Sequence, residues 1–322
     1  MNEPAPRERR HVLEPKEETM RPFVTVLAFA IIAIPLSAAE PTLAEKLKPI
    51  IDAHKGKVAI AVKNLATGEA YERNPDEVMQ TASLIKLAIM VEAYRQADEK
   101  TLDLTKMMTV TKEDKVPGAG ILTDHFSDGA MLSIRDGIRL MIRYSDNTAT
   151  NMVLDRVGIK NVNIYTAKLG IPETRINSKV YKRSSSSVDL ARSEKYQLGS
   201  TTAKETSKLL ELIHTEKAAS AESCKAMIAH LKANDDKELL VRYLPTGTVM
   251  AHKTGATNQV RNDAGILFVP DATDADKKRK IPVIIVVLTN ENEDQRWILD
   301  NAAQVTIAKI GKAVYEHVKK SP

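Results

Sequence analysis

The stretch Ser83-Leu-Ile-Lys-Leu-Ala-Ile-Met-Val91 combines one serine and one lysine with an otherwise apolar sequence. Such a segment predicts a buried helix, from Ser83 to Gln96. Ser83 and Lys86 are three residues apart, so they share one face of that helix. A buried lysine is costly unless it has a partner or a chemical role. A neutral amine can take the proton of a hydroxyl, so Ser83 is a candidate nucleophile and Lys86 its candidate base.

Two further polar triplets occur farther along the chain. Ser145-Asp146-Asn147 follows an amphipathic run, and Lys253-Thr254-Gly255 follows the β-like run 247–252. Ser-x-x-Lys alone is expected about once by chance in a chain of this size, whereas each specific triplet is much rarer. The three motifs together therefore indicate one catalytic site rather than three separate surface features.

Composition and charge limit the classes of protein that fit. The chain has 322 residues, 43% hydrophobic and 28% charged, which is typical of a folded protein with a large core. The net charge is +5, but basic and acidic residues are interspersed, and the basic run 277–280 is interpreted as a solvated turn, so no nucleic-acid partner is predicted. Cys224 is the only cysteine, which excludes an internal disulfide. No histidine motif of a metal site occurs, so no metal or other cofactor is predicted.

Residues 20–39 have the pattern of an export signal. A short basic start is followed by the apolar core 23–36 and by the small-residue cleavage site Ser37-Ala-Ala39. Residues 1–39 are therefore predicted to be an N-terminal extension and signal peptide. We expect an exported, periplasmic or extracellular monomer, whose only membrane contact would be residues 23–36 if they stay uncleaved.

The order of the predicted elements indicates a discontinuous fold. Strands are predicted at 57–63, 69–73, 248–253, 265–269 and 281–289. Helices are predicted at 83–96, 133–144, 147–157, 160–169, 202–215, 219–232 and 295–319. An α+β fold would satisfy this order, with an antiparallel sheet flanked by helices and an inserted all-helical lobe. We expect an α/β lobe of residues 42–80 and 246–319 and a helical lobe of residues 81–245, forming one catalytic domain over 42–319.

Ser-x-x-Lys, Ser-Asp-Asn and Lys-Thr-Gly together are the motif set of class A β-lactamases and penicillin-binding proteins, and the chain resembles this family over roughly residues 42–318. The separations, 62 residues from Ser83 to Ser145 and 108 from Ser145 to Lys253, are similar to those of class A β-lactamases. The resemblance implies the two-lobe fold, an acyl-enzyme on serine, and a small β-lactam or a D-Ala-D-Ala-type wall peptide as substrate.

The resemblance also implies catalytic roles. Ser83 would be the nucleophile, and its N–H and that of Ala256 would form the oxyanion hole. Lys86 would be the base for acylation. Ser145 would pass a proton to the leaving nitrogen, oriented by Lys253.

Four further residues would bind substrate if the resemblance holds. Asn147 would hold the base and the substrate's amide side chain, although it could instead be a helix N-cap. Thr254, with Arg261, would bind the substrate carboxylate. Gly255 would leave the strand edge open, because a side chain there would block the substrate. Asp146 is expected to be structural, in a turn or at a helix start.

One departure from the family leaves several functions open. Class A β-lactamases carry a glutamate, after the helical lobe, that positions the water releasing the acyl-enzyme. Its counterpart is expected near residue 181, but residues 177–184 contain no carboxylate. Glu173, Asp189 or Glu194 could activate the water in a rearranged loop. Alternatively, the protein is a D,D-peptidase or penicillin-binding protein that releases its acyl group slowly, or a non-catalytic binder. We expect a β-lactamase-type serine hydrolase.

Overall fold

The computed structural model describes residues 1–5, 9–17, 40–276 and 278–320, and the structural statements below concern these residues. The chain divides into two units, Met1–Glu40 and Pro41–Pro322. The described residues of the first unit form no helix or strand. The export signal predicted for residues 20–39 lies outside the described residues. In the described ranges, no helix has the length and apolar character needed to cross a membrane.

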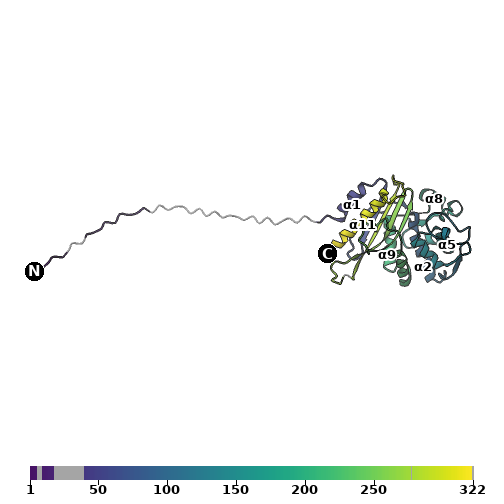
Figure 1. The fold of residues 1–322 in the computed structure, drawn as a ribbon, viewed down its shortest axis with the longest axis horizontal. Coiled ribbons are helices and arrows are strands. Elements are labelled where there is room, and N and C mark those ends of the chain that lie inside the picture. Colours follow the sequence, from purple (N-terminus) through teal and green to yellow (C-terminus); the bar gives the residue numbers. More distant parts are fainter. Residues whose placement is uncertain (6–8, 18–39, 277, 321–322) are drawn as a thin grey trace. The chain divides into compact units, whose positions relative to one another are not determined.

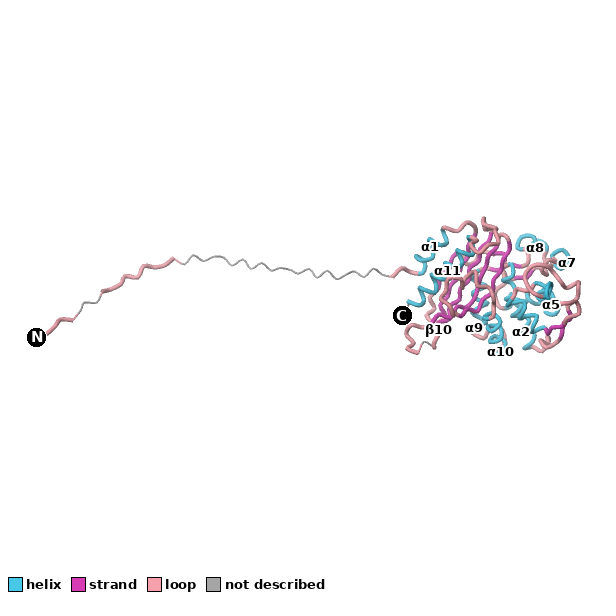
Figure 2. The backbone as a smooth tube through the Cα atoms, viewed as in Figure 1, coloured by secondary structure: helices cyan, strands magenta, loops and turns pink. Residues whose placement is uncertain are grey.

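A five-stranded antiparallel sheet forms the centre of the second unit (Figures 1 and 2). The strand order is β2-β1-β10-β9-β8. Their bounds are β1 (Lys57–Asn64), β2 (Ala70–Arg73), β8 (Val249–Thr257), β9 (Val260–Pro270) and β10 (Lys280–Asn290). β1 pairs with β10, with Lys57 opposite Asn290. This pairing confirms the prediction that both ends of the domain contribute to one antiparallel sheet.

Both faces of this sheet are covered by helices, which explains why β10 is apolar along most of its length. On one face, α1 (Leu43–Asp52) and α11 (Ala302–Lys320) lie together against the sheet (Figure 1). Their apolar residues share a core cluster with Ile285 of β10. On the other face, Ile284 and its neighbours belong to the core that includes α9 (Ala203–His214). Successive side chains of a strand point to opposite faces, so a central strand between two helical layers is apolar at every position.

The remaining large helices surround α2 (Lys86–Asp98), which is buried over most of its length as predicted. The helices in contact with α2 are α4 (Ile134–Arg143), α5 (Asn147–Val157), α6 (Ile159–Lys168) and α10 (Ala221–Lys232). Since α9 contacts β1, β9 and β10, and α10 contacts β8, these two helices join the sheet to the other helices. The exact division into two lobes stays a prediction.

Short elements fill the connections between these helices and strands. They are β3 (Met79–Gln80), β4 (Met107–Thr109), α3 (Leu122–His125), β5 (Met131–Ser133), β6 (Arg175–Ile176), α7 (Arg183–Ser186), α8 (Leu190–Tyr196) and β7 (Gly199–Thr201). β6 and β7 pair with each other, and β7 also pairs with β3.

Two predicted helix starts are wrong. Ser83 lies in a 3₁₀ turn, Ala82–Ile85, directly before α2, rather than in the first turn of an α-helix. The helix predicted from residue 295 begins at Ala302, because the side chain of Asn301 accepts hydrogen bonds from the N–H groups of residues 303 and 304 and so caps the helix there.

Candidate active site

The three sequence motifs meet at one cavity of about 1390 Å³. Ser83 reaches it from the 3₁₀ turn before α2, and Ser145 from the connection between α4 and α5. Asn147 reaches it from the first residue of α5, and residues 253–256 from the edge strand β8. Ser83 is half-buried, whereas its two neighbours on each side are buried. The structure therefore exposes one hydroxyl of this turn to the cavity.

Gly255 holds β8 against the turn that carries Ser83. A Cβ at Gly255 would lie 2.4 Å from the carbonyl oxygen of Thr81, 2.7 Å from the nitrogen of Leu84 and 3.0 Å from that of Ser83. A side chain would therefore push the strand away from the turn. Close backbone packing, rather than access for substrate, is the structural reason for this glycine. The approach is compatible with an oxyanion hole built from the Ser83 and Ala256 N–H groups.

Lys86 is completely buried, and its amine forms three hydrogen bonds. Its Nζ donates to the Ser145 carbonyl (2.6 Å), the Ser145 hydroxyl (3.1 Å) and the Asn147 Oδ1 (3.0 Å). Three acceptors match the three N–H bonds of an ammonium group. Burial, followed by the positive charge of Lys253, lowers the pKa of Lys86 well below its ordinary value, against an opposing effect of Asp146.

Hydrogen bonding and burial therefore have opposite effects on the protonation state of Lys86. The hydrogen bonds suit the protonated amine, while burial favours the neutral form that a base requires. Within the described residues, no hydrogen bond is formed by the Ser83 hydroxyl. Proton transfer from Ser83 to Lys86 therefore stays a prediction.

Lys253 approaches the same serine from β8. Its Nζ donates to the Ser145 hydroxyl at 3.1 Å and to the Thr254 carbonyl at 2.8 Å. Burial lowers the pKa of Lys253 to about 8, although Asp236 and Asp263 act to raise it. Because the Ser145 oxygen accepts from two lysines, its own O–H is free to donate to a third group. Ser145 also has a φ of +53°, a left-handed conformation that is costly for a non-glycine residue.

Asp146 is structural, as expected. Its carboxylate caps α5 by accepting from the N–H of Ala149 (2.8 Å), and it also accepts from the N–H groups of residues 121 and 122. The alternative that Asn147 is the N-cap is wrong, because Asp146 is the N-cap and Asn147 is the first residue of α5. The Asn147 amide instead accepts from the buried lysine and donates to the Pro117 carbonyl at 3.0 Å.

Arg261 lies outside the cavity lining, and its side chain is only 2% exposed. The guanidinium donates to backbone carbonyls, including those of Val260 (2.9 Å) and Arg296 (3.2 Å). It also lies over the ring of Trp297, with 4.3 Å to the centroid. The guanidinium donates to backbone carbonyls of the protein itself, so we leave Arg261 out of the carboxylate site.

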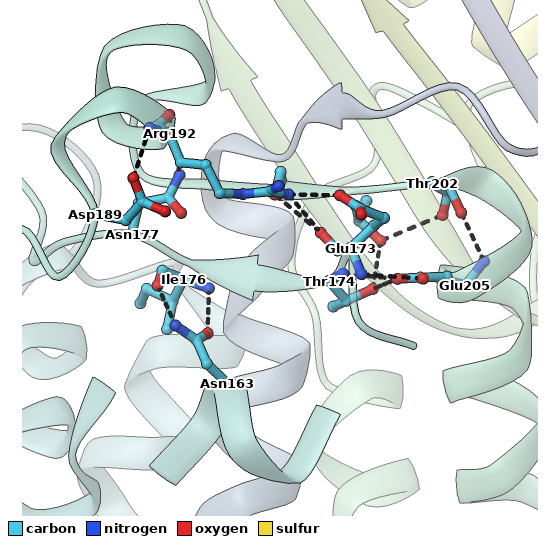
Figure 3. A network of polar contacts seen from close by, with 11 residues as sticks. Asn163, Glu173, Thr174, Ile176, Asn177, Asp189, Arg192, Thr202 and Glu205 are labelled. Carbon is cyan, nitrogen blue, oxygen red and sulfur yellow. Dashed lines mark hydrogen bonds and ion pairs between the residues drawn. The ribbon is translucent and has the colours of Figure 1, made fainter. Parts of the chain in front are cut away.

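The loop of residues 173–201, in which a deacylating carboxylate was expected, is held in place by polar contacts near its ends (Figure 3). Glu173 forms an ion pair with Arg192 at 2.7 Å, and Arg192 also donates to Ser200. Glu205 accepts from the N–H groups of Glu173 (3.0 Å) and Thr174 (2.6 Å). These contacts join both ends of the loop to the start of α9.

None of the three predicted carboxylates lines the cavity. Glu173 is engaged at the loop base, Asp189 caps α8 by accepting from the N–H of residue 192 at 3.0 Å, and Glu194 is an exposed residue of α8. Tyr181, near the sequence position where the family's glutamate is expected, does line the cavity. A relocated carboxylate from this loop is therefore not supported by the geometry.

Several lining residues gave no signal in the sequence, because loops distant in the chain bring them together. They are Gln80, Gly118, Ala119, Arg143, Tyr144, Tyr181, Gln197, Asn234, Asp235, Asp236, Lys237, Glu238, Thr257, Asn258, Gln259, Gln295 and Trp297. Arg143 pairs with Asp235 at 2.9 Å, so part of the charge at this rim is already neutralised.

Comparison with known proteins agrees with this arrangement. The extended-spectrum β-lactamase PER-1 of Pseudomonas aeruginosa is 23% identical over 304 residues, covering 91% of this chain and 92% of the relative. The crystal structure of a β-lactamase from Sphaerobacter thermophilus matches with a TM-score of 0.73 and 28% identity, covering 87% of this chain and 98% of that one. A solved structure of PBP-A matches with a TM-score of 0.72 and 23% identity, covering 87% and 96%.

The fold, the motif geometry and these similarities lead to one family. The model of the beta-lactamase enzyme family matches residues 42–318, a range that includes all three motifs and every strand of the sheet. The chain belongs to the beta-lactamase enzyme family.

Proposed function

We propose that the protein is a serine hydrolase of the class A β-lactamase type, which opens the amide of a β-lactam through an acyl-enzyme on Ser83. The observation that carries this proposal is that two buried lysines, Lys86 and Lys253, donate to one hydroxyl, that of Ser145, in the cavity that Ser83 also lines. Buried groups with lowered pKa values around nucleophilic hydroxyls are typical of proton-transfer sites.

Acylation would proceed by proton transfers between these groups. Neutral Lys86 takes the proton of Ser83 while the serine oxygen bonds to the lactam carbonyl carbon. The N–H groups of Ser83 and Ala256 stabilise the resulting oxyanion. As the C–N bond breaks, Ser145 gives its proton to the lactam nitrogen and receives one from protonated Lys86, so the amine returns to its neutral form.

The proposed binding site uses residues on both sides of the nucleophile. Asn147 holds the substrate's amide side chain from the α5 side, where its own amide is fixed by Lys86 and Pro117. Thr254 binds the substrate carboxylate next to the positive charge of Lys253. Water then completes the hydrolysis by attacking the ester carbon and freeing Ser83.

A D,D-peptidase or penicillin-binding protein is the second candidate, and one observation favours it. The loop presents Tyr181 to the cavity, while its nearest acids, Glu173, Asp189 and Glu194, lie elsewhere. Removing a general base costs about 10²- to 10⁴-fold in the step that it serves. Such an enzyme would be acylated normally and would release its acyl group slowly. Its substrate would be a D-Ala-D-Ala-type wall peptide.

Time-resolved intact mass of the protein mixed with a penicillin separates these functions. An adduct on Ser83 that disappears within seconds supports a β-lactamase. An adduct that persists for many minutes supports the penicillin-binding candidate. The complete absence of an adduct would contradict both and would leave the non-catalytic binder.

We also propose that the protein acts as an exported monomer. Support for export comes from the signal-like sequence of residues 20–39. N-terminal sequencing of the protein recovered from the cell envelope tests export. A mass below the full-length value would show that the segment is removed, and the full-length mass would show that it is kept. Sedimentation at several concentrations tests the monomer.

A further inference from the structure

Trp297 is the only tryptophan of the chain and lies at the rim of the active-site cavity. It belongs to the segment between β10 and α11, and 64% of its surface is exposed. An indole contributes a large contact area with only two rotatable bonds, which suits it to ligand contacts. A tryptophan this exposed contributes little to the core of the protein.

The indole is held in place before any ligand binds. Its Nε1 donates to the side chain of Asn258 at 2.9 Å, and the guanidinium of Arg261 lies 4.3 Å from the ring centroid. Arg261 is in turn fixed by the backbone carbonyls of Thr257, Val260 and Arg296. A cation stacked on a ring and a hydrogen bond at its edge together fix the plane of that ring. Because a guanidinium covers only one face, the opposite face is available.

The direction of β8 indicates which part of a substrate would reach this face. In the proposed complex, the carboxylate lies at Thr254 and the reacting carbonyl at Ala256. Asn258, which holds the indole, comes next along the chain, on the side away from the carboxylate. The group that extends in that direction is the acylamino side chain, whose amide is assigned to Asn147 on the facing wall.

We propose that Trp297 is a specificity-determining residue that stacks on a planar, apolar acylamino side chain. The preferred substrates are then β-lactams acylated with an aryl group rather than the unacylated nucleus. This inference rests on the proposed function for the identity of the ligand. Stacking on the exposed face of the Trp297 indole, which we call the platform, can be tested by binding alone.

The first experiment compares acylation of Ser83 by benzylpenicillin and by 6-aminopenicillanic acid, which has the same nucleus without the aryl side chain. Trp297→Ala should lower the second-order acylation constant for benzylpenicillin about three- to tenfold, the usual contribution of one aromatic contact, and leave that for 6-aminopenicillanic acid unchanged. Trp297→Phe should retain most of the preference. Leu299→Ala is the matched control, because Leu299 is 58% exposed but outside the cavity lining. Equal losses for both compounds, or none, would overturn the proposal.

The second experiment separates failure of this inference from failure of the proposed function. In Ser83→Ala no ester can form at residue 83, and the tryptophan fluorescence of this protein comes from a single indole. Saturable quenching by benzylpenicillin, but not by 6-aminopenicillanic acid, supports the platform even if the wild type is never acylated. Normal acylation of the wild type without any quenching would leave the proposed function standing and reject the platform.

Discussion

Lys86 and Lys253 donate to the same oxygen, since the Nζ of each lies 3.1 Å from the Ser145 hydroxyl. Two ammonium groups that share one acceptor repel each other, and the charge of Lys253 is the largest cause, after burial, of the low pKa of Lys86. The availability of Lys86, on α2, as a base therefore depends on the charge of a residue on strand β8.

Lys253→Met should shift the pH dependence of acylation. Acylation by neutral Lys86 increases with pH as Lys86 loses its proton. Removing the neighbouring cation raises the pKa of Lys86. The acidic limb of the pH–rate profile for acylation should therefore move to higher pH. The overall rate will also fall because Lys253 no longer orients Ser145, so the position of the limb is the measured quantity. Lys237→Met, on the cavity rim, is the control; an unmoved limb in Lys253→Met would show that the two lysines are not coupled.

Ser83→Ala should abolish covalent labelling by a penicillin, and Lys86→Ala should slow acylation by about 10²- to 10⁴-fold. Near-ultraviolet circular dichroism checks that both variants keep the fold. Lys208→Ala removes an exposed lysine and serves as the control. Labelling that persists on another residue in Ser83→Ala would exclude the assigned nucleophile, and an unchanged rate in Lys86→Ala would exclude the assigned base.

Tyr181→Glu should shorten the lifetime of the acyl-enzyme if it is long in the wild type. The substitution places a carboxylate in the cavity lining, where it can activate water, and we expect a gain of at least about tenfold. Tyr181→Gln is the matched control, with similar size and no base. Both variants keep the same strain at residue 181, where φ is +57°. Intact mass against time gives the lifetimes; equal lifetimes for Glu and Gln would show that a missing base is not the cause.

Gly255→Ala should lower both stability and acylation. The added methyl would meet the backbone of the turn at 2.4 Å, so β8 must move away from Ser83, at a cost of about 1–3 kcal/mol in the free energy of unfolding. Gly68→Ala is the comparison, because its methyl meets no atom within 4 Å although φ is +79°. That variant should lose stability but keep the wild-type acylation rate. Wild-type acylation in Gly255→Ala would mean that the oxyanion site does not require this close contact.

Glu205→Gln should loosen the loop of residues 173–201. One carboxylate accepts from two backbone N–H groups and the Thr174 hydroxyl, so its neutralisation should cost about 1–3 kcal/mol and increase amide exchange at Glu173 and Thr174. Glu293→Gln removes an exposed ion pair with Lys55 and should cost less than about 1 kcal/mol. Unchanged exchange in Glu205→Gln would show that the loop is held by other contacts.

The elements that could be predicted from sequence are those with a local cause. β10 is apolar along most of its length because both faces are covered, and α5 was predicted with the observed bounds because Asp146 and Gly158 flank it. α1 was not predicted, although the capping box of Thr42 and Glu45 marks its start, because Pro49 interrupts the pattern.

Features that depend on tertiary contacts could not be predicted. Gly255 was explained by substrate access, because nothing local shows that the Ser83 turn packs against it. Arg261 has a sequence position compatible with binding a carboxylate, but its environment is fixed by residues 296–297, which are distant in sequence. Tyr181 entered the lining through the path of a long loop, for which no local pattern exists.

The pairing of β1 with β10 has a consequence for biosynthesis. β1 can pair with β2 early, but its other partner, β10, is available only after nearly the whole chain has been made, because β10 lies just before the last helix. Sheets closed by such distant segments form slowly, since a long loop must be ordered first. A nascent chain that emerges with its N-terminus leading therefore cannot complete its central sheet before β10 has been synthesised.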